Sequence, residues 1–280
     1  MTMLVVNHLA KTYGDPAAGG VEAIRDISFD VRPREFLCIV GPSGGGKTTL
    51  LRCLCGLHAR SGGTIELNGR NITEPPPEMA AVFQDYSRSL MPWFTVHRNI
   101  ELPLQNTIKD KQVRAERIAW SLHEVGLDGL GDRYPWQLSG GMQQRVAIAR
   151  AIAYEPEILI MDEPFASVDA QTRSDLEDLM LSIQQDVGTA VVLVTHDIDE
   201  AVYLADRVVV LSSRPSTVLE NLEIELPRPR DQITTKSLPR FAAYRNHVLE
   251  LIRATSRPSN LTATEQPYPA HGLPARTRQT

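Results

Sequence analysis

Eight residues, Gly41-Pro42-Ser43-Gly44-Gly45-Gly46-Lys47-Thr48, predict the fold more strongly than any other part of the chain. They follow a five-residue apolar run, 36–40, which predicts a buried strand, and they lead into 49–54, which predicts a helix. The spacing G-x-x-x-x-G-K-[ST] between a strand and a helix is typical of a phosphate-binding loop, because glycines let successive backbone N–H groups point at phosphate oxygens. We therefore expect the chain to bind a nucleoside triphosphate, and the flanking strand and helix argue against a chance glycine-rich turn.

Two side chains of this loop have expected roles of their own. Lys47 can reach the β- and γ-phosphates, and the hydroxyl of Thr48 can bind Mg²⁺. The positive end of the following helix adds to the field that attracts phosphate.

The composition is that of a globular protein and argues against several classes. The chain has 280 residues, of which 42% are hydrophobic and 22% are charged. Its net charge of −5 argues against a nucleic-acid binder, which usually carries a basic excess. No apolar run approaches the roughly 18–20 residues needed to cross a bilayer, and the first residues lack the pattern of a signal peptide. We therefore expect the chain to stay in the cytosol, where it can dock on a membrane protein.

The three cysteines, Cys38, Cys53 and Cys55, have no spacing typical of a disulfide framework. Their odd number fits a reducing compartment. We interpret them as small buried hydrophobic residues rather than as metal ligands or redox groups.

The order of the predicted elements indicates an α/β fold with a mostly parallel sheet at its core. Apolar runs that predict buried strands lie at 36–40, 80–83, 158–161, 190–194 and 208–211. A helix is expected over 170–186. Buried strands that alternate with helices form a parallel sheet covered on both faces.

The N-terminal part is expected to form a smaller antiparallel β subdomain. Residues 3–13 and 21–32 are typical of two strands joined by a glycine-rich loop. Residues 64–67 alternate like a half-exposed strand that closes at Asn68-Gly69. We expect Gly62-Gly63, just before this strand, to form a turn.

The residues between two of the core strands have a different character. Residues 86–150 predict a mainly helical insertion, with an apolar helical stripe that ends at Gly126. The stripe consists of Val113, Ala115, Ile118, Leu122 and Val125. We expect one nucleotide-binding domain over 1–255, which includes this insertion and a C-terminal extension at 221–255. Residues 256–280, rich in Pro, Thr and Arg, are expected to be a disordered tail.

Two acids end the apolar run at 158–161. Because ligands bind at the carboxyl ends of parallel strands, Asp162 is placed to hold Mg²⁺. Glu163 can polarise an attacking water as a general base. The alternative, that two acids merely begin the next loop, is weakened by the phosphate-binding loop upstream.

The stretch Leu138-Ser139-Gly140-Gly141-Met142-Gln143 indicates the family. Ser139 is a good helix N-cap, and the two glycines leave N–H groups at the helix start free for an anion. The stretch resembles the signature motif of ATP-binding-cassette (ABC) ATPases, and it lies in that family's order relative to the phosphate-binding loop and the acidic pair. The resemblance covers residues 3–250 and implies a P-loop NTPase that hydrolyses ATP with Mg²⁺.

The resemblance implies roles for further positions. Tyr13 matches the aromatic residue that stacks on adenine, although a Tyr packed in the β subdomain is the alternative. Gln84, at the end of the strand 80–83, matches the glutamine that reaches Mg²⁺ and the attacking water. His196 resembles the switch histidine that touches the γ-phosphate. Asp169, in Ser167-Val168-Asp169, matches a loop that crosses between subunits.

Taken together, the resemblance implies three groups of residues in each chain. The catalytic residues are Lys47, Gln84, Glu163 and His196. The ATP contacts are Tyr13, Gly41, Pro42, Ser43, Gly44, Gly45, Gly46, Lys47, Thr48 and Thr49. The Mg²⁺ ligands are Thr48, Gln84 and Asp162.

The signature motif in this family caps the ATP held by a second copy of the chain. The residues that would contact the partner's ATP are Leu138, Ser139, Gly140, Gly141, Met142, Gln143 and Asp169. ATP binding and hydrolysis would then close and open a head-to-tail dimer, because the closed state alone makes these contacts.

Three short motifs resemble a branch of the family that imports nitrate, sulfonates and taurine. They are the Pro92-Trp93 pair within 90–96, Tyr134-Pro135-Trp136-Gln137, and Leu226-Pro227-Arg228-Pro229-Arg230-Asp231. The apolar residues 90–96 are expected either to form a socket for a membrane permease or to pack inside the insertion. The branch implies a peripheral subunit on the cytoplasmic side of the inner membrane, a homodimer on a permease, and a solute-binding protein that acts indirectly.

Other functions are less consistent with the sequence. An exporter or a lipoprotein-release ATPase is the alternative within the family. A soluble ABC ATPase that acts on nucleic acid or ribosomes usually has two cassettes or a long coiled-coil insertion, and this chain shows neither. A GTP-binding switch would need an Asn-Lys-x-Asp motif, which we do not find.

Two departures from the family pattern carry expectations of their own. Arg34 stands where the family commonly has a glycine, and because its side chain disfavours a positive φ, we expect this hairpin to take another shape. The Gly44-Gly45-Gly46 run is expected to raise the entropy cost of ordering the loop.

Overall fold

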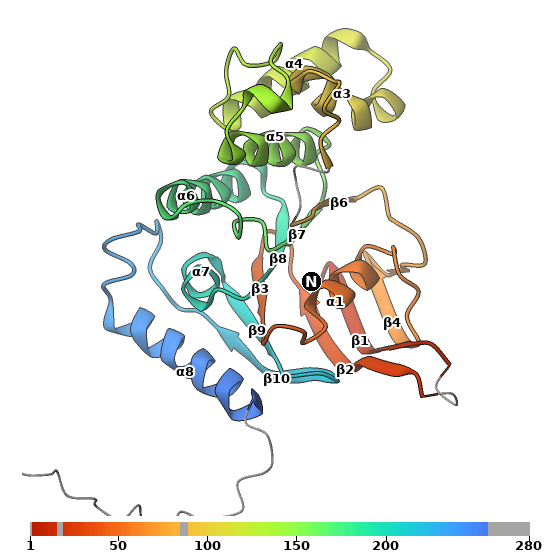
Figure 1. Cartoon of the computed structure of the whole chain (residues 1–280), viewed down its shortest axis with the longest axis vertical. Helices are drawn as coiled ribbons and strands as arrows, with labels where there is room; N and C mark the ends of the chain where they lie inside the picture. Colours follow the sequence, from red (N-terminus) through yellow and green to blue (C-terminus); the bar gives the residue numbers. More distant parts are fainter. Residues whose placement is uncertain (1, 16–18, 85–88, 257–280) are drawn as a thin grey trace, which may run out of the picture.

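The computed structural model describes residues 2–15, 19–84 and 89–256. Its described strands form one ten-stranded sheet in the order β5-β4-β1-β2-β10-β9-β3-β8-β7-β6. The strands are β1 (Leu4–Tyr13), β2 (Val21–Val31), β3 (Phe36–Val40), β4 (Gly62–Leu67), β5 (Arg70–Asn71), β6 (Met79–Val82), β7 (Ile158–Asp162), β8 (Ala190–Thr195), β9 (Arg207–Leu211) and β10 (Ser216–Glu223). Figure 1 shows the sheet running through the molecule with helices on both sides.

The five strands β9, β3, β8, β7 and β6 run parallel to one another. The central strand β3 is buried on both faces. Its residues Phe36, Cys38 and Val40 belong to one hydrophobic core, and Leu37 and Ile39 belong to the other. Two cores on opposite faces explain why this strand is an unbroken apolar run. The prediction of a mostly parallel sheet covered on both faces is confirmed.

The strands β4, β1 and β2 form the antiparallel part, as predicted. The helix α1 (Lys47–Leu54) packs against the second core beside these strands. The strand β10, which the sequence analysis missed, pairs with β2 in parallel and with β9 in antiparallel orientation. The antiparallel part is therefore continuous with the central sheet, because β10 joins the two.

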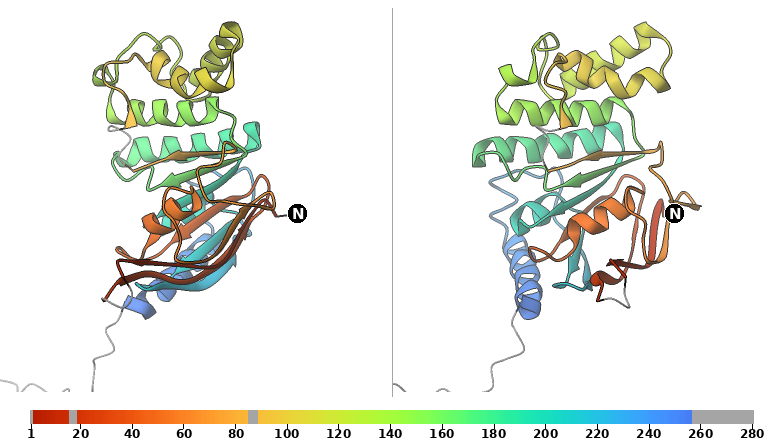
Figure 2. Two further views of the ribbon diagram at one scale, coloured as in Figure 1. Left: turned by 90° about the vertical axis from the view of Figure 1, so that its right-hand side faces the viewer. Right: turned by 45° about the vertical axis from the view of Figure 1, so that its right-hand side comes forward.

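Among the described residues, three α-helices lie between β6 and β7 in the chain. They are α3 (Val96–Thr107), α4 (Lys111–Glu124) and α5 (Gly140–Ala153), with the 3₁₀ helix η2 (Pro135–Gln137) before α5. Each α-helix is preceded by an N-cap residue whose side chain accepts a hydrogen bond from a backbone N–H of the first turn. These N-cap residues are Thr95, Asp110 and Ser139. Figures 1 and 2 show these helices at one end of the molecule, away from β1 and β2, and α5 packs against β6. The predicted helical insertion is therefore present, while the domain boundaries remain a prediction.

Three further helices contribute to the hydrophobic core that contains Phe36, Cys38 and Val40. They are α6 (Ala170–Val187), α7 (Ile198–Leu204) and α8 (Pro239–Ser256). The helix α7 packs on β3 and β8, and α8 packs on α7 and β9. The predicted C-terminal extension thus contains a helix that the sequence analysis did not identify. Residues 256–280 were expected to be a disordered tail, and 257–280 lie outside the described residues. No helix of the described chain is both long and apolar enough to span a membrane.

Three local expectations were wrong. Gly62 and Gly63 do not form a turn: they begin β4, opposite an irregularity in β1, and Gly63 has a φ of +77°. A Cβ there would lie 2.3 Å from the carbonyl oxygen of His8, so the close backbone approach requires glycine. The second wrong expectation is that the strand at 80–83 is buried. Residues of β6 before Val82 are only half-buried, because β6 is the edge strand.

The third wrong expectation concerns Arg34, which does adopt a positive φ, of +62°. Its guanidinium donates to the carbonyl oxygen of Gln185, 3.3 Å away, at the end of α6. Its own carbonyl oxygen accepts a hydrogen bond from Gln184. These contacts with the C-terminal turn of α6 offset the backbone strain, since cationic side chains are favourable at that end of a helix.

Candidate functional site

The phosphate-binding loop follows β3 and ends in the first turn of α1. Gly44 and Gly46 have φ values of +75° and +80°. A Cβ on Gly45 would lie 2.9 Å from the carbonyl oxygen of Pro42. All three glycines are therefore required by geometry, and side chains here would distort the loop rather than merely reduce its flexibility.

The loop lines a pocket of about 300 Å³. The lining residues are Tyr13, Ala23, Ser43, Gly44, Gly45, Gly46, Lys47, Thr48, Thr49, Glu163 and Arg214. The pocket brings together most of the predicted ATP contacts with the predicted general base. Gly41 and Pro42 lie outside this lining and contribute their carbonyl groups to the loop instead.

Lys47 is held by the loop that precedes it. Its Nζ atom donates to the carbonyl oxygens of Gly41, at 2.9 Å, and Pro42, at 3.1 Å. Burial lowers the pKa of Lys47, and the charges of Glu163 and Asp162 oppose that shift. The side chain is thus fixed as a cation among backbone oxygens, next to two acids, where it can also meet phosphate.

Asp162 ends β7 and is buried. Burial raises its pKa, and a hydrogen bond with Thr48 partly opposes that rise. Within the described residues, its Oδ1 atom has no hydrogen-bond donor. A hydroxyl beside a carboxylate with a free buried oxygen fits a Mg²⁺ ion, which prefers oxygen ligands and completes its shell with phosphate and water.

The described residues include no group of three or more His, Cys, Asp and Glu side chains arranged to hold a metal by themselves. The donor set of Thr48 and Asp162 suits a cation that enters with a nucleotide, because phosphate oxygens would supply the remaining ligands.

The side chain of Glu163, which follows β7, contacts side chains that follow both neighbouring strands. Its Oε2 atom accepts a hydrogen bond from Nε2 of Gln84, 3.3 Å away, and lies 3.2 Å from Nδ1 of His196. Gln84 follows β6 and His196 follows β8, so the neighbours of β7 bring both side chains to it. The structure thus places Gln84, Glu163 and His196 together, as the sequence analysis expected of catalytic groups.

The backbone of Glu163 is strained. Its φ is +44°, which is uncommon for a residue with a side chain, and its N–H donates to the carbonyl oxygen of Val194 at 2.7 Å. Such conformations are kept where the surroundings fix them, often at active sites. Here the bond to β8 fixes the turn that aims the carboxylate at the pocket.

Tyr13 lies at the rim of the pocket, at the end of β1. Its hydroxyl is 3.3 Å from Oγ1 of Thr49 and 3.1 Å from Nδ1 of His58. The Nζ atom of Lys11 lies 4.9 Å from the ring centroid. Tyr13 is 39% exposed, so a base can reach it, and its stacking role remains a prediction.

Arg214 is a pocket residue that the sequence analysis missed. It lies between β9 and β10, and its Nε atom donates to the carbonyl oxygen of Glu22 at 3.2 Å. An arginine opposite the phosphate-binding loop can meet an anion. Its sequence signal is an Arg-Pro pair after a buried strand, which has no local link to phosphate chemistry.

The signature residues lie elsewhere in the chain, at the start of α5. The side chain of Ser139 accepts from the N–H of Met142 at 3.3 Å, and the amide of Gln143 donates to the carbonyl oxygen of Pro135 at 2.9 Å. None of 138–143 lines the 300 Å³ pocket. The separation within one chain agrees with a motif that acts on a second copy.

Asp169 is the N-cap of α6. Its side chain accepts from the N–H of Thr172 at 3.0 Å and from its hydroxyl at 2.8 Å, and the backbone hydrogen bond lowers its pKa. A Cβ on Gly141 would lie 2.5 Å from Cγ2 of Thr172. The signature and the Asp169 loop are therefore in contact within one chain, through Thr172.

Known proteins with similar sequences support the resemblance. The nitrate import ATP-binding protein NrtC of Synechococcus elongatus is 42% identical over 258 residues, which are 91% of this chain. The chain spans only 39% of the length of NrtC. The taurine import ATP-binding protein TauB of Escherichia coli is 42% identical over 254 residues, 89% of this chain and 97% of TauB.

A solved structure is similar as well. The ATP-binding cassette MJ0796, solved as a dimer bound to ADP and Pi, matches with a TM-score of 0.69 and 29% identity, over 79% of this chain and 99% of that one. Residues 24–166 match the ABC transporter family. With the parallel sheet and its phosphate-binding loop in place, these matches confirm the predicted fold class, and the chain belongs to the ABC transporter family.

Proposed function

We propose that the chain is the ATP-hydrolysing subunit of an importer for a small solute. The observation that carries this proposal is the meeting of Gln84 and His196 at one oxygen of Glu163, which also lines the pocket of the phosphate-binding loop. A base, a γ-phosphate sensor and a phosphate cradle in one place suit hydrolysis rather than nucleotide storage.

In this proposal the backbone N–H groups of residues 43–48 and Nζ of Lys47 hold the phosphates. Thr48 and Asp162 would hold Mg²⁺, which supplies charge stabilisation for phosphoryl transfer, and the side chain of Gln84 is a further candidate ligand. Glu163 accepts a proton from the attacking water, and Oε2 keeps its orientation through Gln84 and His196. Tyr13 offers its ring to the adenine.

A second copy of the chain would complete the enclosure of the nucleotide. Ser139 and the two glycines after it present the N-terminus of α5, which favours an anion. Asp169 lies next to this surface through Thr172. The dimer of MJ0796 bound to ADP and Pi supports an assembly of this kind.

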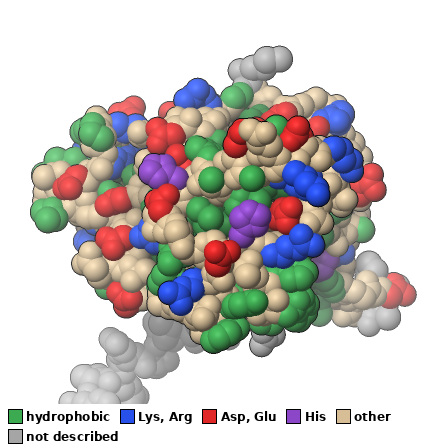
Figure 3. All heavy atoms as spheres, turned by 90° about the horizontal axis from the view of Figure 1, so that it is seen from above, with side chains coloured by type: hydrophobic (Ala, Val, Ile, Leu, Met, Phe, Trp, Pro, Cys, Tyr) green, Lys and Arg blue, Asp and Glu red, His purple; other side chains and the backbone are tan. Residues whose placement is uncertain are grey.

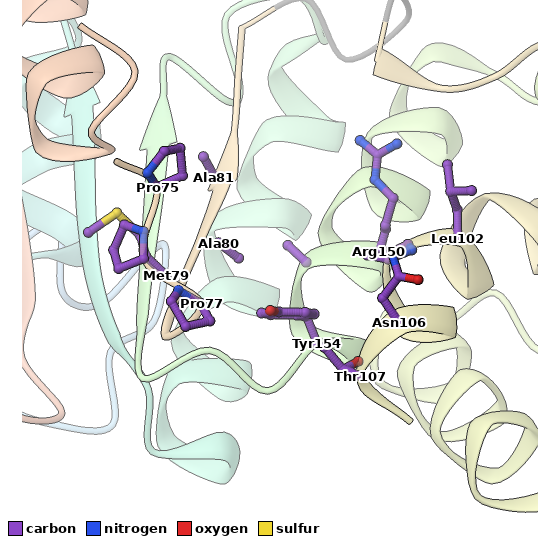
Figure 4. A pocket seen from close by; sticks show the side chains of 13 residues that line it. Pro75, Pro77, Met79, Ala80, Ala81, Leu102, Asn106, Thr107, Arg150 and Tyr154 are labelled. Carbon is purple, nitrogen blue, oxygen red and sulfur yellow. The ribbon is translucent and has the colours of Figure 1, made fainter. Parts of the chain in front are cut away.

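A membrane permease is the proposed partner on another face. A pocket of about 630 Å³ lies between β6 and the helices α3 and α5. Its lining is mostly apolar: Pro75, Pro76, Pro77, Met79, Ala80, Ala81, Leu102, Pro103, Asn106, Thr107, Arg150, Ala151 and Tyr154. Figure 4 shows Ala80 of β6 and the flat ring of Tyr154 among the side chains around this space. An apolar groove of this size suits a short helix of a partner.

The residues 90–96 contribute less to such a socket than the sequence suggested. Leu90 and Val96 are buried in the core, while Trp93 is 68% exposed. Trp136 is 69% exposed and stacks on Tyr134 with ring centroids 5.8 Å apart. In Figure 3, which views the molecule from the side of the insertion, hydrophobic side chains alternate with charged ones. Exposed tryptophans of this kind suit a contact with the permease or its surroundings.

The names of the relatives guide the choice of cargo and location. NrtC is a nitrate import protein and TauB is a taurine import protein, so a small anion or a sulfonate is the proposed solute class. The subunit would sit on the cytoplasmic side of the inner membrane as a peripheral protein, with a solute-binding protein acting through the permease.

The test is to purify the chain with the permease that binds it in cells and to reconstitute the complex in proteoliposomes. ATP turnover should rise when a solute-binding protein loaded with nitrate or taurine is present. Turnover that ignores every binding protein would contradict import. Stimulation by nucleic acid, with no membrane protein copurifying, would contradict the transport proposal altogether.

A further inference from the structure

A small cavity lies beside Glu163 and His196. Its volume is about 40 Å³. It is lined by Glu163, Phe165, Ala166, Arg173, Thr195, His196, Asp197 and Glu200. Only Glu163 and His196 among them have a role in the proposed mechanism, and the others include the charged residues Arg173 and Glu200. The cavity therefore joins the reacting end of the site to two charged residues of α6 and α7.

Glu200 is almost completely buried, at 4% exposure. Its Oε2 atom accepts a hydrogen bond from Oγ1 of Thr195 at 3.2 Å. Its Oε1 atom has no hydrogen-bond donor in the part of the chain that the structure describes. A buried carboxyl oxygen without a partner is costly, so native proteins supply one, commonly an ordered water.

Arg173 presents the complementary group. Its Nη1 atom donates to Oδ2 of Asp197 at 3.2 Å, while its Nε atom is buried and meets no acceptor among the residues at 2–15, 19–84 and 89–256. A residue with an unpaired donor and a residue with an unpaired acceptor thus line the same cavity. A water needs roughly 10–15 Å³ and at least two polar partners, and the cavity offers both.

Arg173 and Glu200 also lie near the starts of two helices of the site. Arg173 is in the first turn of α6, whose N-cap is Asp169. Glu200 is in the first turn of α7, which begins directly after His196 and Asp197. A bridge between them ties the start of α6 to the start of α7.

We propose that the cavity holds a buried water that bridges Nε of Arg173 and Oε1 of Glu200, and that Glu200 is thereby a positioning residue for His196. The water accepts from the guanidinium and donates to the carboxyl oxygen, so both unpaired groups are satisfied. A movement of Asp169 then reaches His196 through two links, the ion pair of Arg173 with Asp197 and the water to Glu200.

The surroundings of Glu200 support this assignment. Burial raises its pKa well above the usual value, with further contributions from the charges of Glu177 and Asp197. Natural cores seldom keep an acid in such a place without use, since an apolar residue of similar size would be as stable or more so.

The test compares Glu200→Leu with Glu200→Gln in the permease complex. Leucine has a similar size but cannot bind the water, so kcat for ATP should fall about 10- to 100-fold, because a small misplacement of His196 is enough. The dissociation constant for ATP, measured by calorimetry, should not change, since no contact to the nucleotide is lost. Glutamine keeps an acceptor at this place and should restore most of kcat.

Two further readouts separate positioning from plain packing. A high-resolution crystal structure should show a water between Arg173 and Glu200 that is lost in Glu200→Leu. The ring ¹⁵N resonances of His196 should shift in Glu200→Leu and not in Glu35→Gln. Glu35 is a buried acid just before β3, so this control lies at the opposite end of the parallel strands from His196.

The inference rests on the proposed ATPase function, but different experimental results would contradict the function and the role of Glu200. A wild-type complex without ATP turnover would contradict the proposed function. Wild-type turnover together with full kcat in Glu200→Leu, or a cavity without water, would overturn the role of Glu200 and leave the function intact.

Discussion

The Nδ1 atom of His196 lies 3.2 Å from Oε2 of Glu163, so the two residues meet across the ends of the neighbouring strands β8 and β7. The same oxygen accepts from Gln84. One carboxylate oxygen therefore serves both partners, and in the proposed mechanism the other oxygen, Oε1, would act on the water. This arrangement makes Glu163 the most informative residue to change.

Glu163→Gln should bind ATP and hydrolyse it about 10²- to 10⁴-fold more slowly, because an amide cannot accept the proton of the attacking water. The amide keeps the size of the side chain. ATP bound without turnover should hold two copies together, so a dimer should accumulate with ATP and Mg²⁺ in size-exclusion chromatography. Phosphate release measures the rate.

The control for this variant is Glu157→Gln. Glu157 is exposed, directly precedes β7 and accepts from Asn68 at 2.7 Å, so it lies at the opposite end of the same strand. It should keep wild-type turnover and show no ATP-dependent dimer. A Glu163→Gln protein that binds ATP but stays monomeric would contradict a nucleotide site that two copies of the chain share.

Lys47→Ala should weaken ATP binding about 10- to 100-fold, which corresponds to the loss of a charged hydrogen bond. The mutation also removes the donor for the carbonyl oxygens of Gly41 and Pro42, so the folded state should be checked by circular dichroism. Calorimetry with an ATP analogue gives the affinity. Lys111→Ala, at an exposed position on α4, is the matched control. Unchanged affinity in Lys47→Ala would remove the lysine from the site.

Arg214→Ala should reduce the affinity for ATP about two- to fivefold, a small effect because the side chain is exposed and screened by solvent. The effect should shrink as salt is added. Arg25→Ala is a suitable control, since Arg25 also contacts Glu22, through its side chain at 3.0 Å, but does not line the pocket. Equal affinities for the two variants, measured at low salt, would show that Arg214 does not meet the nucleotide.

The central features were predictable because their signals are local. The strand 36–40, the glycine loop and Lys47 occupy thirteen consecutive residues, and the unbroken apolar run already implies burial on both faces. The acids after β7 and the histidine after β8 follow from the rule that parallel strands present their carboxyl ends at one edge. The meeting of Gln84 and His196 at Glu163 follows from the order of strands, which the family resemblance supplied.

The features that were missed depend on contacts between distant residues. Arg34 tolerates its positive φ because it meets the end of α6, about 150 residues later in the chain. The strand β10 is mostly half-buried and lacks an apolar run, and only its pairing with both β2 and β9 makes it a strand. Arg214 reaches the pocket only because β10 places the preceding loop beside Gly45, whose Cβ position lies 3.2 Å from the carbonyl oxygen of Ser212.

Glu200 should make stability depend on pH. The folded chain holds its proton to a higher pH than the unfolded chain, whose value is 4.5, because burial and the charges of Glu177 and Asp197 raise the folded pKa, while Thr195 and Arg173 oppose the rise. Above about pH 4.5 the unfolded chain therefore loses this proton first, and the contribution of Glu200 to stability falls as pH rises towards the folded pKa.

Glu200→Gln cannot ionise, so its free energy of unfolding relative to wild type should increase with pH, by at most about 1.4 kcal/mol per pH unit. Urea unfolding from about pH 5 to about pH 8 measures the difference. Glu223→Gln, which changes an exposed acid paired with Arg32 on the surface, should give a curve parallel to wild type. If the unfolding free energy of Glu200→Gln changes with pH in parallel with that of wild type, burial does not raise the pKa of Glu200.

Leu102→Glu should prevent assembly with the permease. Leu102 lies in α3, is 38% exposed and lines the apolar pocket beside β6, so a charge there would have to be desolvated when a partner helix enters. The isolated chain should keep its affinity for ATP, because the pocket that contains Lys47 is separate.

The matched control is Val113→Glu, since Val113 is also an exposed apolar residue of the helical insertion, at 42%, but lies on α4 outside the pocket. Copurification with the tagged permease measures docking. We expect Val113→Glu to copurify like wild type and Leu102→Glu to be lost from the membrane fraction. If both variants copurify equally, the permease binds elsewhere. The exposed Trp93 and Trp136 are then the surface to test, because large exposed apolar side chains mark interaction sites.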